Sequence, residues 1–87
     1  MNKNLKELQT IPGVGPRIAR IFWNIGIKKV LDLRGKSPEK LYEKICFNQG
    51  HQVDRCVLYV CRSSVYFAEN KNPDPKKLKW WNWKDKT

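Results

Sequence analysis

The apolar residues of the first 26 positions recur at helical spacing in two stretches, which are separated by glycines and prolines. Leu5 and Leu8 predict a short helix of about two turns, ending before Pro12 because proline pushes its predecessor out of the helical region. A second helix is predicted from Pro16, a favoured first helical residue, to Gly26, a typical helix stop. Its apolar positions are Ile18, Ala19, Ile21, Phe22 and Ile25. The pattern therefore predicts a helix, a glycine turn and a second helix.

The middle of the chain continues in short helical pieces. Residues 28–34 predict a helical turn that Gly35 closes. Ser37 is positioned to cap a further helix that begins with Pro38 and ends at Asn48-Gln49-Gly50. The inner stripe of that helix would be formed by Leu41, Tyr42, Ile45 and Cys46.

The longest helix is predicted from Asp54 to about Asn70. Its valines would also suit a strand. A period of two, however, would place Arg62 and Ser64 on the same face as Val60, so the helical period is favoured. The apolar face of this helix would be formed by Val53, Cys56, Val57, Val60, Cys61, Ser64, Val65 and Ala68.

A tryptophan-rich tail follows the long helix. Asn72-Pro73-Asp74-Pro75 breaks the chain, and Asp74 is placed to cap a last short helix that reaches Leu78. Trp80, Trp81 and Trp83 then either close the core over the long helix or form a surface on which unpaired bases stack.

Together these elements predict an all-α single domain over residues 1–87, with five or six short helices. We expect a hairpin region over residues 4–49, with a degenerate second hairpin. The long helix and the tryptophan-rich tail would form the remainder, residues 50–87.

Length and composition narrow the class of protein. With 87 residues, 40% of them hydrophobic, the chain supports a modest core with little room for a large cavity or a deep catalytic cleft. It contains no run of about 18 apolar residues, and its N-terminus is polar, so we expect a soluble, cytoplasmic protein without a membrane partner. Cys46, Cys56 and Cys61 are odd in number and lack metal-site spacing, which favours buried thiols and no metal.

The distribution of charge adds a candidate partner. The net charge is +10, of which residues 1–36 carry +6 and residues 70–87 carry +4, whereas residues 37–69 are neutral. A neutral middle between two basic segments is typical of a patch that meets a polyanion such as DNA.

The turn Gly13-Val14-Gly15 is the candidate site within the basic N-terminal segment. Glycine lacks a Cβ, so such a turn can bring its N–H groups, and the positive end of the next helix, close to a phosphate. Arg17 and Arg20, together with Lys28 and Lys29, would neutralise neighbouring phosphates without reading bases. The alternative is a tight turn between packed helices, with the arginines on a solvated face.

A shift of 22 residues aligns the first hairpin with the segment that follows it. Ile11 then falls on Leu33, Gly13 on Gly35, and Pro16 on Pro38. Either the second hairpin is a degenerate duplicate of the first, or the alignment over so few positions is accidental.

The pattern Leu8-x-x-Ile11-Pro12-Gly13-Val14-Gly15-Pro16-x-x-Ala19 resembles the helix-hairpin-helix motif. That resemblance implies a turn that holds a DNA phosphate, in some members with a monovalent cation on the turn carbonyls. The second hairpin departs from the motif, because Ser37 replaces the second glycine and Glu39 stands at the position that matches Arg17.

A wider resemblance covers nearly the whole chain. The segments Asp54-Arg55-Cys56-Val57-Leu58-Tyr59-Val60, Pro73-Asp74-Pro75 and Leu78-Lys79-Trp80-Trp81-Asn82-Trp83-Lys84-Asp85 resemble the pathogenicity-locus family of small proteins. The N-terminal half is also similar to the C-terminal domain of TfoX-type competence regulators. The second resemblance again implies work related to DNA, by analogy only, whereas the first is specific for family membership and not for function.

The sequence offers little support for catalysis. His51 is the only histidine, and a dyad with Cys46 or Cys56 would need a third group to orient the imidazole. Asp54 is better placed to begin the long helix. We therefore predict a non-enzymatic, monomeric protein that binds the DNA backbone weakly, without sequence preference and in a salt-sensitive way.

The alternative function is an adaptor that binds a protein partner in a salt-tolerant way. Its contact would be a stripe on the long helix at steps of three, four and seven, formed by Arg55, Tyr59, Arg62 and Tyr66. The same stripe could instead pack beside the tail.

Overall fold

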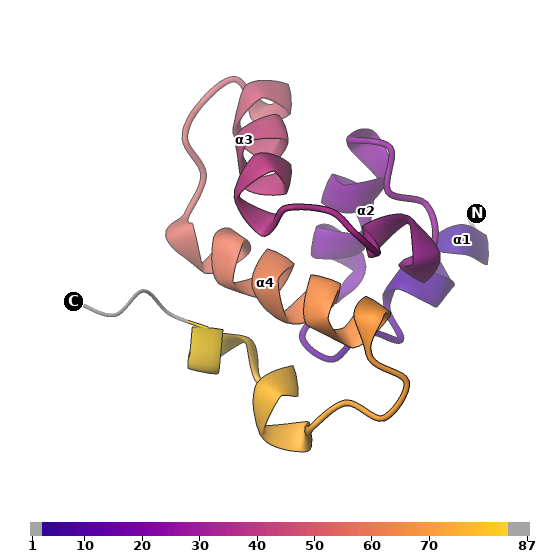
Figure 1. Cartoon of the computed structure of the whole chain (residues 1–87). Helices are drawn as coiled ribbons and strands as arrows, with labels where there is room; N and C mark the ends of the chain where they lie inside the picture. Colours follow the sequence, from indigo (N-terminus) through magenta and orange to yellow (C-terminus); the bar gives the residue numbers. More distant parts are fainter. Residues whose placement is uncertain (1–2, 84–87) are drawn as a thin grey trace.

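The computed structural model describes residues 3–83, in which the regular secondary structure is helical and no strand is present. Figure 1 shows four α-helices: α1 (Lys3–Leu8), α2 (Pro16–Asn24), α3 (Pro38–Gln49) and α4 (Arg55–Glu69). Three short 3-10 helices complete the described chain: η1 (Val30–Leu33), η2 (Pro75–Leu78) and η3 (Trp80–Trp83). The all-α prediction is confirmed.

Local capping explains where the larger helices begin and end. Ser37 accepts a hydrogen bond from the backbone N–H of Lys40, and Pro38 is the first residue of α3. Gly50, with a φ angle of 79°, ends α3 in the left-handed conformation. Asp54 caps α4 by accepting from the Cys56 N–H, and this bond lowers the pKa of the Asp54 carboxyl group.

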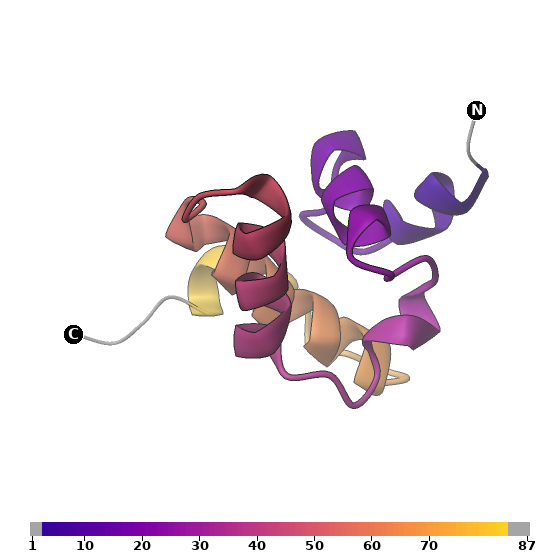
Figure 2. The ribbon, with the colours of Figure 1, turned by 90° about the horizontal axis from the view of Figure 1, so that it is seen from above.

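Helix α4 is the central element of the fold. In Figure 1 it crosses the middle of the molecule, with α3 above it, the α1–α2 unit behind it and the tail below it. Figure 2 shows the molecule from above, with α3 crossing over α4 and α2 set apart from α3. The core between them is formed by Leu8, Ile11, Val14, Ala19, Phe22, Ile27, Leu33, Leu41, Ile45, Val60, Cys61 and Val65.

The tail packs along α4, as one of the two interpretations of its tryptophans predicted. Helix η3 lies against α4, and the Trp83 indole N–H donates to the Lys77 carbonyl at 2.7 Å. Arg62 of α4 in turn donates to the Trp83 carbonyl at 2.8 Å. Trp80 packs against the core, whereas Trp81 keeps 49% of its surface exposed.

Because both α3 and the tail pack against α4, the helix buries more than the expected face. Leu58 and Ser63, which the helical pattern did not place inward, are both 1% exposed. The Ser63 hydroxyl donates to the Val60 carbonyl at 3.1 Å. Ser64 is fully buried, and its hydroxyl has no hydrogen-bond partner within the described residues.

Among the described residues, no helix is long and apolar enough to cross a membrane.

Candidate nucleic-acid interface

The turn between α1 and α2 is held by its two apolar residues. Ile11 and Val14 are buried in the core, at 1% and 5% exposure, and the backbone N–H of Val14 donates to the Ile11 carbonyl at 3.0 Å. Gly13 lies between them with a φ angle of 88°, a conformation that residues with a Cβ rarely adopt. Gly13 and Gly15 face the solvent. The turn therefore presents its glycines outward while its apolar side chains anchor it.

The backbone donors of this turn differ from the predicted set in one respect. The Val14 N–H is used inside the turn, so Val14 supplies an anchor and not a donor to a phosphate. Within the described residues, the N–H groups of Gly13 and Gly15 have no hydrogen-bond acceptor. Gly15 is the N-cap of α2 and offers no side-chain cap, so the N–H groups of Arg17 and Ile18 also remain available.

Trp80 brings the tail into contact with this turn. A Cβ built on Gly13 would lie 3.2 Å from Cδ1 of the Trp80 ring, closer than an ordinary van der Waals contact. Gly15, in contrast, has no heavy atom within 4 Å of the same position. Trp80 thus borders the side of Gly13 on which a Cβ would lie, although Gly13 stays exposed, whereas Gly15 has open space on that side.

The second turn, between η1 and α3, repeats the backbone of the first at the offset of 22 residues. Gly35 has a φ angle of 75°, and the Lys36 N–H donates to the Leu33 carbonyl as the Val14 N–H does to Ile11. The Leu41 N–H donates to the Ser37 carbonyl, which matches the bond from Ala19 to Gly15. The two turns are therefore structural equivalents, each followed by a helix that begins with proline.

An internal carboxylate occupies the second turn. Oε2 of Glu69, at the end of α4, accepts a hydrogen bond of 2.8 Å from the Gly35 N–H. The equivalent donor in the first turn is the Gly13 N–H, which has no acceptor among the described residues. Sequence reasoning missed Glu69, because 34 residues separate it from Gly35 and no local pattern links the two.

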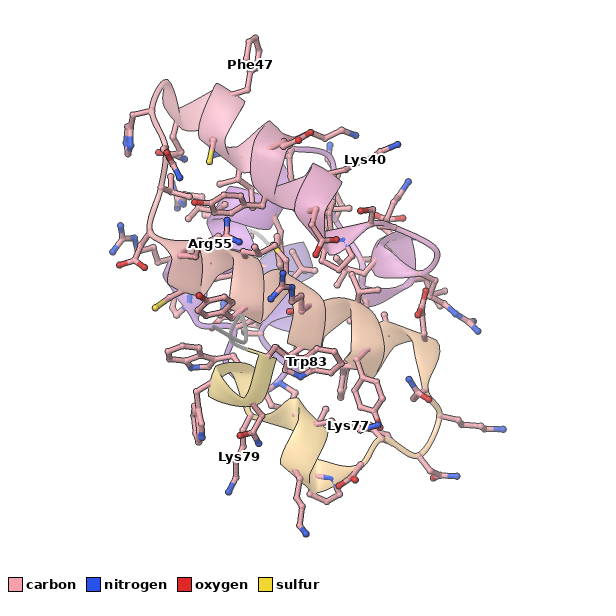
Figure 3. All side chains as sticks on the ribbon, turned by 60° about the vertical axis from the view of Figure 1, so that its left-hand side comes forward. Lys40, Phe47, Arg55, Lys77, Lys79 and Trp83 are labelled. Carbon is pink, nitrogen blue, oxygen red and sulfur yellow. The ribbon has the colours of Figure 1, made fainter. Side chains whose placement is uncertain are left out.

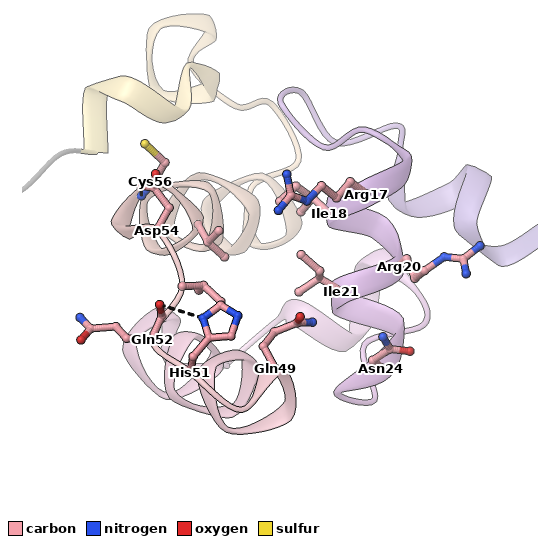
Figure 4. A pocket seen from close by; sticks show the side chains of 12 residues that line it. Arg17, Ile18, Arg20, Ile21, Asn24, Gln49, His51, Gln52, Asp54 and Cys56 are labelled. Atoms are coloured by element: carbon pink, nitrogen blue, oxygen red, sulfur yellow. Dashed lines mark hydrogen bonds between the residues drawn. The ribbon is translucent and has the colours of Figure 1, made fainter.

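The four basic side chains predicted to surround the turn divide into two groups. Arg17 and Arg20 are exposed near the start of α2, and neither has an acidic partner within the described residues. In Figure 4 the Arg17 side chain extends over the cleft between α2 and the loop that joins α3 to α4, whereas the Arg20 side chain points away from this cleft. Lys28 and Lys29 follow the other end of α2, about 13 Å along a helix of nine residues. The Lys28 ammonium lies 4.8 Å from the centroid of the Trp23 ring. The fold therefore places only the arginines beside the turn.

A cleft of about 650 Å³ separates α2 from the loop between α3 and α4, which the small size of the chain did not lead us to expect (Figure 4). Its walls include Ile18, Ile21 and Val57, and His51 lies at its edge. Nδ1 of His51 lies 3.1 Å from the Gln52 carbonyl.

The thiols are held in structural positions. Cys46 accepts a hydrogen bond from the Val53 N–H, with 3.5 Å between nitrogen and sulfur. Cys61 is fully buried, and burial raises its pKa from 9.0 to about 12, which keeps it a neutral thiol at physiological pH. Cys56 is half-buried, so the expectation of buried thiols holds fully for Cys61 alone. Within residues 3–83, no group of three His, Cys, Asp or Glu side chains is arranged to hold a metal ion.

The aromatic stripe of α4 takes part in packing the tail. The Tyr66 ring lies 5.7 Å from the Trp83 ring, and its hydroxyl accepts from the Asp74 N–H at 2.8 Å. The Arg62 guanidinium lies over Tyr59 at 5.7 Å and pairs with Glu39 at 3.3 Å. Much of the surface predicted for a protein partner is therefore engaged within the chain.

These features define a small, basic, all-helical protein with two equivalent turns, one bound by an internal carboxylate and one open. The chain belongs to the pathogenicity locus family, whose model matches residues 1–87. The resemblance drawn from the long helix and the tryptophan tail is thereby confirmed. A relative from Streptomyces lavendulae, the mitomycin resistance protein McrB, is 35% identical over 77 residues, which cover 88% of this chain and 70% of the relative. No solved structure matches the chain.

Proposed function

We propose that α1, the glycine turn and α2 form a helix-hairpin-helix that binds a phosphate of the DNA backbone. Binding would be weak, independent of sequence and without catalysis. The donors would be the N–H groups of Gly13 and Gly15 and those of the first turn of α2, where the helix dipole favours an anion.

The comparison between the two equivalent turns carries this proposal. At the second turn, the N–H of Gly35 binds a carboxylate oxygen of Glu69 at 2.8 Å. The same backbone geometry at the first turn has no internal anion within the described residues. Because a phosphate oxygen accepts hydrogen bonds as a carboxylate oxygen does, the open turn is suited to an external phosphate.

Residue choice at the two N-caps supports the same conclusion. Ser37 caps α3 with its hydroxyl, whereas Gly15 leaves the start of α2 without a side-chain cap. No neighbouring atom within 4 Å requires glycine at position 15. An uncapped helix start gives up some stability but keeps its N–H groups available for a ligand.

Arg17 and Arg20 would add charge beside the bound phosphate. Lys28 and Lys29 would reach only phosphates further along the strand, since the length of α2 separates them from the turn. Glu69 occupies the second turn, so a single turn remains for DNA. We therefore expect a low affinity, since few ionic contacts would support binding.

A substitution at the open N-cap tests the proposal most directly. Gly15→Ser should cap α2 and leave the free energy of unfolding unchanged or higher by a few tenths of a kcal/mol. It should weaken binding to duplex DNA about tenfold, because the new hydroxyl competes for the donors that the phosphate needs. Fluorescence anisotropy at about 50 mM salt measures the affinity, and amide shifts of residues 13–20 locate the contact.

Substitution of the two arginines is a second, independent test of the proposal, and it has a matched control. Arg17→Ala with Arg20→Ala should weaken binding and lower the salt slope of log Kobs by about two. Lys40→Ala with Lys44→Ala removes the same charge from the exposed surface of α3 and should leave the slope within about half a unit. Equal loss in both double variants would attribute binding to net charge alone. Salt-independent binding would favour the adaptor function instead.

A further inference from the structure

The three tryptophans of the tail do not share one environment. Trp80 and Trp83 are partly buried, against the core and against Tyr66 respectively. Trp81 keeps 49% of its surface exposed and is the one large apolar side chain of the described tail that faces solvent to this extent. A half-exposed tryptophan between two packed ones presents apolar ring surface to solvent, beside the side chain of Lys79.

Trp81 is connected to the open turn through Trp80, which contacts both. The Trp80 ring packs on Gly13, and the Trp81 ring meets the Trp80 ring edge-on with 5.7 Å between centroids. A phosphate held at Gly13 and Gly15 would therefore have Trp81 close to its neighbouring nucleotide. The tail and the turn, about 70 residues apart in the sequence, form one surface.

The charge around Trp81 suits a nucleic acid. Residues 70–83 contain four lysines and one aspartate. The Lys79 ammonium lies 5.9 Å from the centroid of the Trp81 ring, and Figure 3 shows Lys79 at the outer edge of the tail. An exposed contact between a lysine and an aromatic ring is weak and exchangeable. Lys79 can therefore leave the ring for a phosphate while a base takes its place.

We propose that Trp81 is a stacking platform for an unpaired base, an inference that rests on the proposed phosphate contact at the turn. Inside a duplex, the faces of each base are covered by its neighbours, whereas an unpaired base offers a free face on which a protein ring can stack. The protein would accordingly prefer a duplex with a single-stranded extension over a blunt duplex. The turn would hold the backbone, and Trp81 would hold the first unpaired base.

The test compares two DNA molecules that share one duplex sequence, one blunt and one with a short single-stranded extension on either strand. Fluorescence anisotropy at about 50 mM salt gives both affinities. The unmodified protein should bind the extended DNA about tenfold more tightly, the scale of one stacked base. Trp81→Ala should lose that preference and keep its affinity for blunt duplex within about twofold. Trp81→Tyr should retain most of the preference, because tyrosine also presents a ring face.

Phe47→Ala is the matched control, since Phe47 is 90% exposed and lies at the opposite end of the molecule in Figure 3. It should change neither affinity. Circular dichroism establishes that each variant is folded, and Trp81→Tyr supplies the comparison if Trp81→Ala is not.

The outcomes separate the two proposals. Blunt duplex bound through residues 13–20 without any preference for the extension would overturn the role of Trp81 and leave the proposed function intact. Equal weakening of both DNA molecules by Trp81→Ala would also overturn it, because the ring would then serve the fold or the duplex. Failure of the unmodified protein to bind either DNA would overturn the phosphate contact and the stacking platform together.

Discussion

Gly13 and Gly15, two positions apart, are glycines for different physical reasons. Gly13 has a φ angle of 88° and lies beside the Trp80 ring, so the backbone conformation disfavours a side chain and the ring would have to shift to accept a Cβ. Gly15 has an extended backbone, with φ of −94° and ψ of −172°, and open space where a Cβ would be. The fold requires the first glycine, whereas the second is explained by the proposed approach of a ligand.

Gly13→Ala should therefore destabilise the protein. The positive φ angle costs an L-residue about 1–2 kcal/mol, and the new Cβ must displace Trp80. We expect the free energy of unfolding to fall by about 1–3 kcal/mol in urea titrations. Gly15→Ala is the control and should lie within about 1 kcal/mol of the unmodified protein. Equal stability of the two variants would contradict the packing of Trp80 on Gly13.

At the scale of elements, the turns before α2 and α3 have matching backbone hydrogen bonds and different occupants. The second begins with the short helix η1 and not with an α-helix, and its turn is bound by the far end of α4 through Glu69. That bond fixes the position of the second unit against α4 and removes one backbone donor from solvent. The second turn thus stabilises the fold, while the first turn keeps its donors.

Glu69→Ala should release the second turn. Loss of the 2.8 Å bond to the Gly35 N–H should lower the free energy of unfolding by about 0.5–1.5 kcal/mol. It should also let a phosphate reach Gly35, whose amide signal would shift during a DNA titration of the variant and not of the unmodified protein. Glu43→Ala, which removes an exposed carboxylate of α3, is the control for charge. An unmoved Gly35 signal in both variants would argue against the equivalence of the turns as anion sites.

At the scale of the whole molecule, the tail joins parts of the chain that are far apart. Trp80 packs on Gly13 and the core, and Trp83 is fastened by Arg62 and by the Lys77 carbonyl. The tail therefore closes α4 on one side and supports the α1–α2 turn on the other. A change in the tail is expected to reach the proposed DNA site through Trp80.

Trp80→Ala should accordingly cost much more stability than Trp81→Ala. We expect a loss of about 2–4 kcal/mol for Trp80, which contacts the core, and of less than about 1 kcal/mol for the half-exposed Trp81. Thermal unfolding followed by circular dichroism measures both. The amide signals of residues 13–15 should move in Trp80→Ala. Similar losses for the two variants would contradict the division between packed and exposed tryptophans.

How far the sequence predicts this protein depends on the range of each interaction. The first residues of α2, α3 and α4 follow from Pro16, Ser37 and Asp54, because capping and proline geometry act within one helical turn. The burial of Leu58 and Ser63 could not be predicted in the same way, since it depends on how α3 and the tail pack against α4. The use of the Val14 N–H within the turn likewise appears only in the folded backbone.

The sequence by itself determined the all-helical class, the positions of the turns, the basic character of the chain and the two glycines that distinguish the first turn. These are local properties of composition, spacing and backbone freedom. Only the tertiary structure decided which turn stays open, because Glu69 reaches Gly35 across 34 residues. It also decided that Trp80 covers Gly13 while Trp81 faces solvent. Contacts between distant segments depend on how the helices pack, and no pattern of neighbouring residues specifies them.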